Sequence, residues 1–110
     1  MEKKEFEKAT AFKFDDLVQY TVDSIVSRTI LNKATGTVTI FAFYEGQGLS
    51  EHKAPFDALV QIADGKAIIV IDGQECHLAK GESIIMPANI PHAVKAVGNF
   101  KMILTMIKSA

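Results

Sequence analysis

Short runs of β-branched and aromatic residues, separated by turn signals, limit the fold of this chain more than any other feature. From residue 24 onward these runs recur at close spacing, and none of them keeps a helical period for long. The clearest turn is Asp72-Gly73, which lies between the runs 66–72 and 75–79, because a type I′ turn needs positive φ at both central positions. Many short strands joined by tight turns predict an all-β sandwich or barrel.

The runs divide most of the chain into candidate strands of a single domain. A chain of 110 residues is long enough for one hydrophobic core and too short for two. We expect one domain over residues 1–110, with an N-terminal extension at 1–15 and the barrel at about 24–108. The predicted strands cover residues 24–32, 36–46, 59–64, 66–72, 75–79, 82–87, 92–97 and 100–108.

Composition and charge exclude several classes of partner. The net charge is −1 and 23% of the residues are charged, without the basic patch that nucleic-acid binding requires or a Lys/Arg cluster suited to anionic lipid. The charged N-terminus lacks the apolar run of a signal peptide, and no apolar stretch approaches the roughly 20 residues of a membrane helix. The single cysteine, Cys76, excludes an internal disulfide. The sequence therefore predicts a cytoplasmic protein that binds neither nucleic acid nor membrane.

Two of the predicted strands are apolar on both alternating faces. In 36–46 and 100–108, valine, isoleucine, leucine, methionine and phenylalanine occupy odd and even positions alike. A strand with one solvated face would alternate more cleanly, so both faces of these strands should be covered. One face can fill the barrel, and the other needs a second sheet layer, the N-terminal segment or another subunit. We predict a homodimer.

Two histidines are the leading candidates for a binding site. Barrels hold small ligands in their mouths by side chains that point inward along each strand. Strict alternation places Ser50, His52 and Ala54 on one face. His92 opens a strand after a loop that contains two prolines, which restrict where that strand begins. We expect His52 and His92 to converge in one pocket.

The spacing around these histidines resembles the cupin superfamily, and specifically its small single-domain members. The usual motifs of that family are G-(x)5-H-x-H-(x)3–4-E-(x)6-G and G-(x)5-P-x-G-(x)2-H-(x)3-N. The resemblance covers about residues 36–107 and implies a double-stranded β-helix, the jelly-roll barrel of the cupin type. The residues that fall on the two motifs are Gly46, His52, Gly65, Gly81, Pro87 and His92.

The chain departs from the family pattern at the metal ligands. A typical cupin metal site has three histidines and a glutamate, and this chain matches only the positions of His52 and His92. Ala54 stands at the second histidine position and Ala58 at the glutamate position. The second motif also has Asn89 in place of its glycine and alanine in place of its asparagine. Two imidazoles alone make a poor site, so the resemblance implies at most a weakly held divalent metal.

A displaced side chain could supply a third ligand. Asp57 is adjacent to the glutamate position, and a bulge near Pro55 would turn it inward. Glu51 has the wrong parity on a regular strand. In the run 75–79, Cys76 and Leu78 are expected to face inward and His77 outward. We retain Asp57 as the candidate third ligand.

The favoured function is the binding of a small molecule in an apolar barrel pocket with two histidines at its polar end. The alternative is a metal-dependent enzyme, dioxygenase-like or isomerase-like, that uses the two histidines and a carboxylate. A metal-free enzyme would use one histidine as general acid or base. A purely structural or protein-binding module would have a filled barrel. The residues predicted to line the pocket are His52, Ala54, Phe56, Ala58, Met86 and His92.

Overall fold

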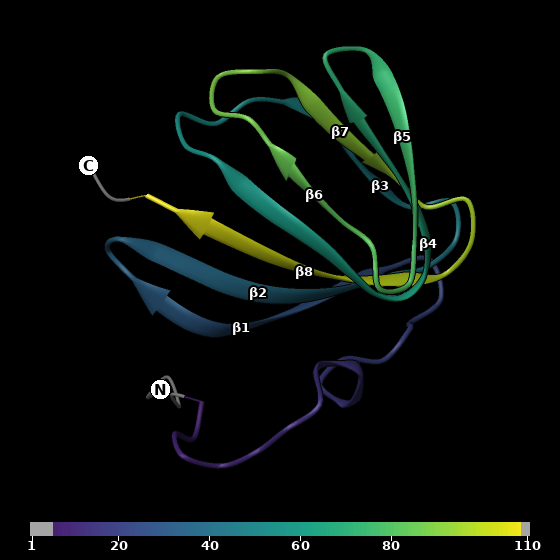
Figure 1. The fold of residues 1–110 in the computed structure, drawn as a ribbon. Helices are drawn as coiled ribbons and strands as arrows, with labels where there is room; N and C mark the ends of the chain where they lie inside the picture. The colour runs from purple at the N-terminus through teal and green to yellow at the C-terminus, as the bar shows by residue number, and fades with distance from the viewer. Residues whose placement is uncertain (1–5, 109–110) are drawn as a thin grey trace.

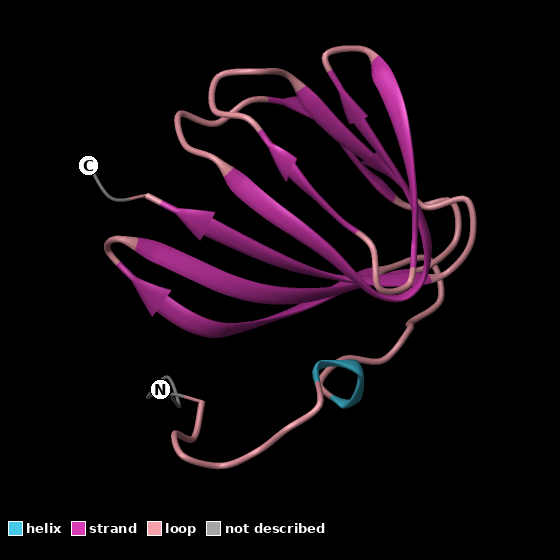
Figure 2. Ribbon diagram, viewed as in Figure 1, coloured by secondary structure: helices cyan, strands magenta, loops and turns pink. Residues whose placement is uncertain are grey.

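Eight β-strands form most of the described chain, residues 6–108, in a computed structural model (Figures 1 and 2). They build one strongly curled antiparallel sheet, so the all-β jelly-roll fold predicted from the sequence is confirmed. No helix within residues 6–108 is long and apolar enough to cross a membrane. The elements are η1 (Phe14–Asp16), β1 (Ile25–Lys33), β2 (Gly36–Phe43), β3 (Gly48–His52), β4 (Ala58–Ile71), β5 (Gln74–Ala79), β6 (Ser83–Met86), β7 (His92–Lys95) and β8 (Phe100–Ile107).

Strand β4 connects the two halves of the curled sheet. The strand order is β1-β2-β8-β4-β7-β3, and β5 and β6 also pair with β4. The sequence predicted two separate strands here, 59–64 and 66–72, but the structure makes them one strand that turns a corner. Its register against β8 shifts between Ile62 and Asp64, and Gly65 adopts a φ of +74°. A bulge and a glycine together give the bend that a regular strand cannot make.

The predicted hairpin between β4 and β5 is confirmed. Asp72 and Gly73 have φ values of +51° and +79°, the positive values that a type I′ turn requires. Six consecutive pairs, from Lys66–Ala79 to Ile71–Gln74, hold the two strands in register. The local sequence was sufficient for this prediction because the turn depends on only two residues.

The inner face of the curled sheet carries the main hydrophobic core. Residues directly opposite each other on paired strands share a face, so the register identifies which side chains point inward. At the centre, the rings of Phe43 and Phe100 stack with their centroids 4.6 Å apart. The buried members of this core are Phe43, Ala58, Val60, Ile62, Ala67, Ile69, Met86, Val94, Ala96, Phe100 and Met102.

A second, smaller core lies on the outer face, beneath the N-terminal segment. Ile40 and Ala42 of β2 are buried there with Val18, and Phe14 and Leu17 pack beside them. In Figure 1 this segment passes below the sheet formed by β1, β2 and β8. The prediction that these strands have apolar contacts on both faces is therefore confirmed for this part of the sheet, with the N-terminal segment as the cover.

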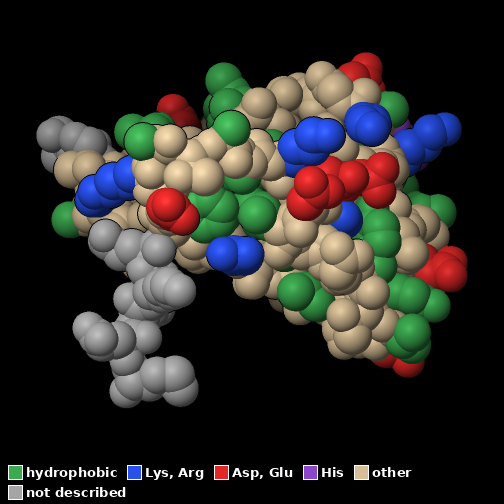
Figure 3. All heavy atoms as spheres, turned by 90° about the horizontal axis from the view of Figure 1, so that it is seen from below, with side chains coloured by type: hydrophobic (Ala, Val, Ile, Leu, Met, Phe, Trp, Pro, Cys, Tyr) green, Lys and Arg blue, Asp and Glu red, His purple; other side chains and the backbone are tan. Residues whose placement is uncertain are grey.

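Polar contacts fasten the N-terminal segment to the sheet. The buried ammonium group of Lys101 donates to the main-chain oxygen of Asp15 at 2.7 Å and lies 3.0 Å from its carboxylate. The hydroxyl of Tyr20 donates to the carboxylate of Asp64 at 2.5 Å, and burial, together with this carboxylate, raises the pKa of Tyr20. Figure 3 shows this side of the molecule, where acidic and basic side chains lie among hydrophobic ones.

Replacing Gly65 tests the importance of the bend in β4. A β-carbon at this position would overlap the main-chain oxygen of Asn99, and the positive φ adds strain for any L-residue. The matched control is Gly73→Ala, because Gly73 has a similar φ of +79° and a β-carbon added there would meet no atom within 4 Å. We expect the control to lose about 1–2 kcal/mol of unfolding free energy and Gly65→Ala to lose two to three times as much. Equal losses in urea denaturation would contradict a steric role at the bend.

Candidate functional site

The two histidines lie side by side on neighbouring strands at one end of the barrel. His52 ends β3 and His92 begins β7, and their α-carbons are directly opposite each other in the antiparallel pair. Their ring centroids are 4.4 Å apart, with an angle of 71° between the ring planes. Forty residues of sequence separate them, so the strand pairing alone brings the two imidazoles into contact.

A β-bulge in β3 determines which side of the sheet His52 occupies. The stretch from Leu49 to His52 spans three positions, whereas its partner stretch from Val94 to His92 spans two. Leu49 packs against the inner core opposite Val94, and the extra residue returns His52 to this same inner side. The strict alternation that placed Ser50 on the face of His52 is therefore wrong, because the bulge interrupts the period of two.

Main-chain carbonyls orient both rings. The Nδ1 atom of His52 lies 2.7 Å from the oxygen of Ser50, and Nδ1 of His92 lies 3.2 Å from the oxygen of Ile90. A carbonyl oxygen only accepts hydrogen bonds, so each Nδ1 must carry the proton and donate it. In the neutral ring, the lone pair then belongs to Nε2. The Nε2 atom of each neutral ring can therefore accept a hydrogen bond from a neighbouring donor group.

The two rings differ in their exposure to solvent. His92 has only 6% of its surface exposed, while His52 is exposed. Burial lowers the pKa of His92, the hydrogen bond to the Ile90 carbonyl opposes this, and the neighbouring His52 lowers it further. His92 is therefore neutral at neutral pH, which keeps the lone pair on its Nε2 free.

The other residues predicted to line the pocket fall into two groups. Ala58 at the start of β4 and Met86 at the end of β6 are both buried and lie directly opposite each other. Ala54 and Phe56 are partly buried in the loop between β3 and β4. The Phe56 ring has the ammonium group of Lys108 5.8 Å from its centroid. The first group belongs to the barrel wall and the second to a loop at the same end of the barrel.

The structure does not bring the candidate third ligand to the histidines. One carboxylate oxygen of Asp57 accepts a hydrogen bond from the main-chain N–H of Ala88 at 2.8 Å and so joins the loops 53–57 and 87–91. Strand β4 begins only at Ala58, so there is no strand near Pro55 in which a bulge could redirect Asp57. Within residues 6–108, no three His, Cys, Asp or Glu side chains form a group that could hold a metal ion.

The residues of β5 follow the predicted alternation. Leu78 packs against the inner core, whereas His77 is exposed and lies 3.2 Å from the carboxylate of Glu75. Cys76 is a free, partly buried thiol. None of these side chains belongs to the histidine pair, and the exposed Glu51 does not supply a carboxylate either.

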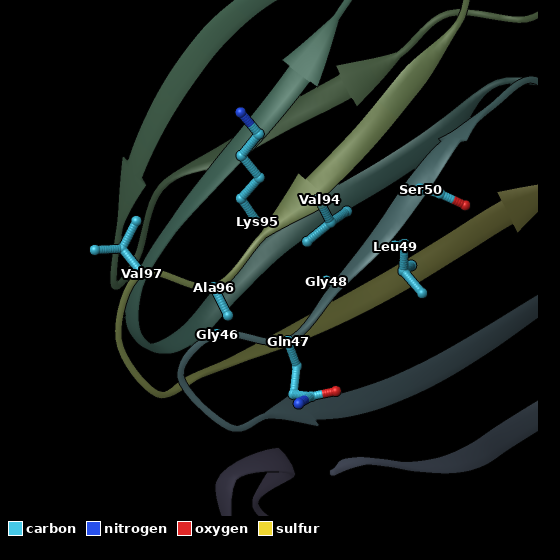
Figure 4. Close-up of a pocket in the computed structure, with 9 residues that line it drawn as sticks. All are labelled: Gly46, Gln47, Gly48, Leu49, Ser50, Val94, Lys95, Ala96 and Val97. Carbon is cyan, nitrogen blue, oxygen red and sulfur yellow. The ribbon is translucent and has the colours of Figure 1, made fainter. Parts of the chain in front are cut away.

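Two open hollows were not anticipated from the sequence. Figure 4 shows one of about 400 Å³ between β3 and the end of β7, beside Gly46, where an added β-carbon would meet no atom within 4 Å. A larger hollow of about 620 Å³ lies where β4, β5 and the β7–β8 loop meet. Neither is lined by His52 or His92. The first is lined by Gly46, Gln47, Gly48, Leu49, Ser50, Val94, Lys95, Ala96 and Val97.

Comparisons with known proteins agree with the fold and with its motifs. The model of the family described as the Cupin domain matches residues 39–108. A crystal structure of a conserved protein of unknown function from Streptococcus pyogenes is 36% identical, with a TM-score of 0.91, and the match covers 97% of this chain and 94% of that one. The comparison with curated proteins gives no match.

Two further solved structures have the same architecture. A Cupin 2 conserved barrel domain protein from Leptotrichia buccalis is 43% identical, with a TM-score of 0.83; the match covers 86% of this chain but only 46% of that longer protein. A cupin superfamily protein from Desulfitobacterium hafniense is 23% identical, with a TM-score of 0.87, over 97% and 98% of the two chains. At this lower identity the likeness concerns the fold alone.

The electrostatics of the histidine pair predict how His92 titrates. Its pKa should lie below the ordinary value of 6.5, and His52→Ala should raise it only partway back, because burial remains the larger cause. Since the unfolded chain then binds the proton first, the free energy of unfolding should fall as the pH drops below about 6.5. NMR titration of the imidazole signals measures the pKa of His92 in the wild type and in His52→Ala. The variant His77→Ala serves as the control for assigning the signals. A His92 pKa at or above 6.5 would contradict this arrangement.

Proposed function

The chain belongs to the cupin family, and we propose that it binds a small molecule at the end of the barrel that carries His52 and His92. The observation that carries this proposal is the pair of imidazoles 4.4 Å apart, each with its Nδ1 held by a carbonyl and its Nε2 free to accept. Buried Ala58 and Met86 supply an apolar wall at the same end. Binding sites of this kind combine an apolar lining with a few well-placed polar groups.

The two Nε2 atoms define the polar end of the proposed site. A neutral imidazole offers a lone pair, so it accepts hydrogen bonds from hydroxyl, amide or ammonium groups of a ligand. Because His92 is buried, water competes poorly for its Nε2. A hydrogen bond from a ligand to this atom therefore contributes more binding free energy than the same bond at an exposed residue. His52 is exposed and accepts from the solvent-facing part of the ligand.

The donor set does not fit a tightly bound metal ion. Zinc sites in enzymes use three protein ligands, and non-haem iron uses two histidines with one carboxylate. Here the pair supplies two nitrogens, and Asp57 holds the Ala88 N–H instead. The alternative, a metal-dependent enzyme, therefore has weaker support than ligand binding. The cytoplasmic location and the absence of nucleic-acid binding stay predictions from the sequence.

Removal of the imidazoles tests the proposed site. A thermal-shift screen of uncharged and charged metabolites should identify compounds that raise the melting temperature of the protein, because a ligand selective for the folded state stabilises it. At a ligand concentration 100 times its Kd, the gain is about 2.7 kcal/mol. The double variant His52→Ala/His92→Ala should lose this gain, whereas His77→Ala, which removes an exposed histidine on β5, should keep it.

Elemental analysis of the same proteins separates ligand binding from the metal-dependent alternative. We expect less than stoichiometric metal in protein purified without chelator, because only two nitrogen ligands are present. One metal ion per chain in the wild type, lost in the double variant, would favour the metal-dependent enzyme. A ligand-induced stabilisation that survives in the double variant would refute the histidine site.

We also propose that the uncovered part of the outer face packs against a second copy of the chain. One row of side chains crosses five strands in register on this face, and it continues the apolar surface beyond the N-terminal segment. The row is uncharged, and its two ends are exposed. A two-fold axis brings the same row of both subunits together, as in sheet-on-sheet packing. The members of the row are Leu31, Val38, Thr105, Leu59 and Ile85.

A charge within this row should prevent association. Ile85 is 60% exposed, so Ile85→Lys should leave the folded subunit intact but place a like charge on both sides of the interface. The matched control is Val97→Lys, because Val97 is 72% exposed and lies away from the row in the β7–β8 loop. Sedimentation velocity at micromolar concentration should show dimers for the wild type and the control, and monomers for Ile85→Lys. A wild-type monomer at this concentration would refute the dimer.

A further inference from the structure

The turn that precedes His92 carries the carbonyl that orients its ring. The N–H of Ile90 donates to the carbonyl of Pro87 at 3.4 Å, so residues 87–90 form a β-turn. Asn89, the third residue of this turn, has a φ of +63°, the positive value that a type II turn requires. The carbonyl of Ile90 then accepts a hydrogen bond from Nδ1 of His92 at 3.2 Å. The direction of this carbonyl therefore determines which ring nitrogen is left as an acceptor.

A side chain joins this turn to the sheet where the main chain does not. The ladder between β4 and β6 ends at the pair Ala58–Met86, and the next residue after β6 is Pro87, which has no N–H to donate. One residue before Ala58, the carboxylate of Asp57 accepts a hydrogen bond from the N–H of Ala88 at 2.8 Å. A charged acceptor makes such a bond stronger than one between neutral groups. The Asp57 side chain thus takes the place of the next rung of the ladder.

Two main-chain hydrogen bonds hold the residues on either side of Ile90. The N–H of Asn89 donates at 2.7 Å to the carbonyl of Ala54 in the β3–β4 loop. On the other side, the N–H of Asp72 donates to the carbonyl of Pro91 at 2.8 Å. Figure 1 shows the β3–β4 and β6–β7 loops next to each other at one end of the barrel. The chain before and after Ile90 is therefore fixed, and with it the direction of the carbonyl that orients the imidazole.

From these contacts we infer that Asp57 is a positioning residue for the proposed site, because it holds the turn whose Ile90 carbonyl keeps Nε2 of His92 an acceptor. This inference rests on the proposed function. The carboxylate acts through the N–H of Ala88 and the turn, not on the ring itself. Without it the turn can relax, and the ring can adopt the tautomer in which Nε2 carries the proton. That tautomer presents a donor where the proposed ligand needs an acceptor.

Two substitutions of Asp57 separate the effect of the hydrogen bond from that of the charge. Asp57→Ala removes both, whereas Asp57→Asn removes the charge and keeps an oxygen that can accept from the Ala88 N–H. The ¹⁵N NMR signals of the imidazoles report the tautomer of His92 in the full chain without ligand, at about pH 8.5, where histidine is neutral. The ratio of the Nδ1–H form to the Nε2–H form should fall about fivefold in Asp57→Ala and stay within about twofold of the wild type in Asp57→Asn.

The variant Ala88→Pro removes the same hydrogen bond from its other partner. Proline has no N–H and is common at the second position of a type II turn, so the turn itself should still form. Ala88→Pro should change the tautomer ratio of His92 as Asp57→Ala does. The double variant should change it no further, because both substitutions remove one and the same contact. The matched control Asp16→Ala removes another exposed aspartate, in η1, and should leave the ratio unchanged.

The outcomes separate this inference from the proposed function. An unchanged tautomer ratio in Asp57→Ala and Ala88→Pro would overturn the positioning role and leave the histidine site to the thermal-shift screen. An equal loss in Asp57→Asn and Asp57→Ala would also overturn it, because the charge and not the hydrogen bond would then act on His92. If Asp57→Ala does not fold, Ala88→Pro decides alone. If the tautomer responds as expected but ligand-induced stabilisation survives in His52→Ala/His92→Ala, the proposed function is wrong and the orienting role of Asp57 stands.

Discussion

The bend in β4 is the constraint on which the rest of the structure depends. This strand pairs with β5, β6, β7 and β8, so it contributes to both halves of the curled sheet. Its first half carries Ala58 beside Met86, and its last residue, Ile71, lies opposite His92. Without the turn at Gly65, where a side chain would overlap the Asn99 carbonyl, the apolar wall and the histidine strand would not belong to one barrel. A backbone position far from the site thus sets its geometry.

At the site itself, backbone hydrogen bonds determine what the side chains can do. The carbonyls of Ser50 and Ile90 each fix one Nδ1 proton, which leaves both Nε2 atoms as acceptors. Carbonyl-oriented histidines of this kind are common around metals. Here two alanines stand where the family resemblance implies further ligands, and in the proposed function the same orientation serves hydrogen-bond donors of a small molecule. Burial of His92 lowers its pKa and strengthens this preference, because it disfavours the cationic ring that would attract anions.

The sequence predicted the features that depend on neighbouring residues and missed those that depend on distant ones. The Asp72-Gly73 turn identifies the hairpin because it reflects a local backbone requirement. The spacing of glycines, prolines and histidines identifies the barrel through its resemblance to the cupin motifs. The continuity of β4 and the bulge before His52 arise from strand partners far along the chain, so a period-two pattern cannot reveal them. The cover of the outer face by the N-terminal segment is likewise long-range, although the double-sided apolar pattern indicated that some cover is required.

The β1–β2 hairpin shows that strand register, and not composition alone, determines which side chains face the inside of the barrel. Serine and threonine in a strand are ordinary, and from the sequence alone they indicate a solvated face. Register places them on the same side as Ile25 and Phe43 of the hydrophobic core, while the charged residues of the same hairpin face outward. Along this face of β2 the core residues Phe43 and Phe41 give way to the partly buried Thr39 and Thr37. Their partners on β1, Thr29 and Asn32, are exposed. A polar strand position is therefore solvated or buried according to its place along the barrel as well as its face, which a period-two pattern does not show.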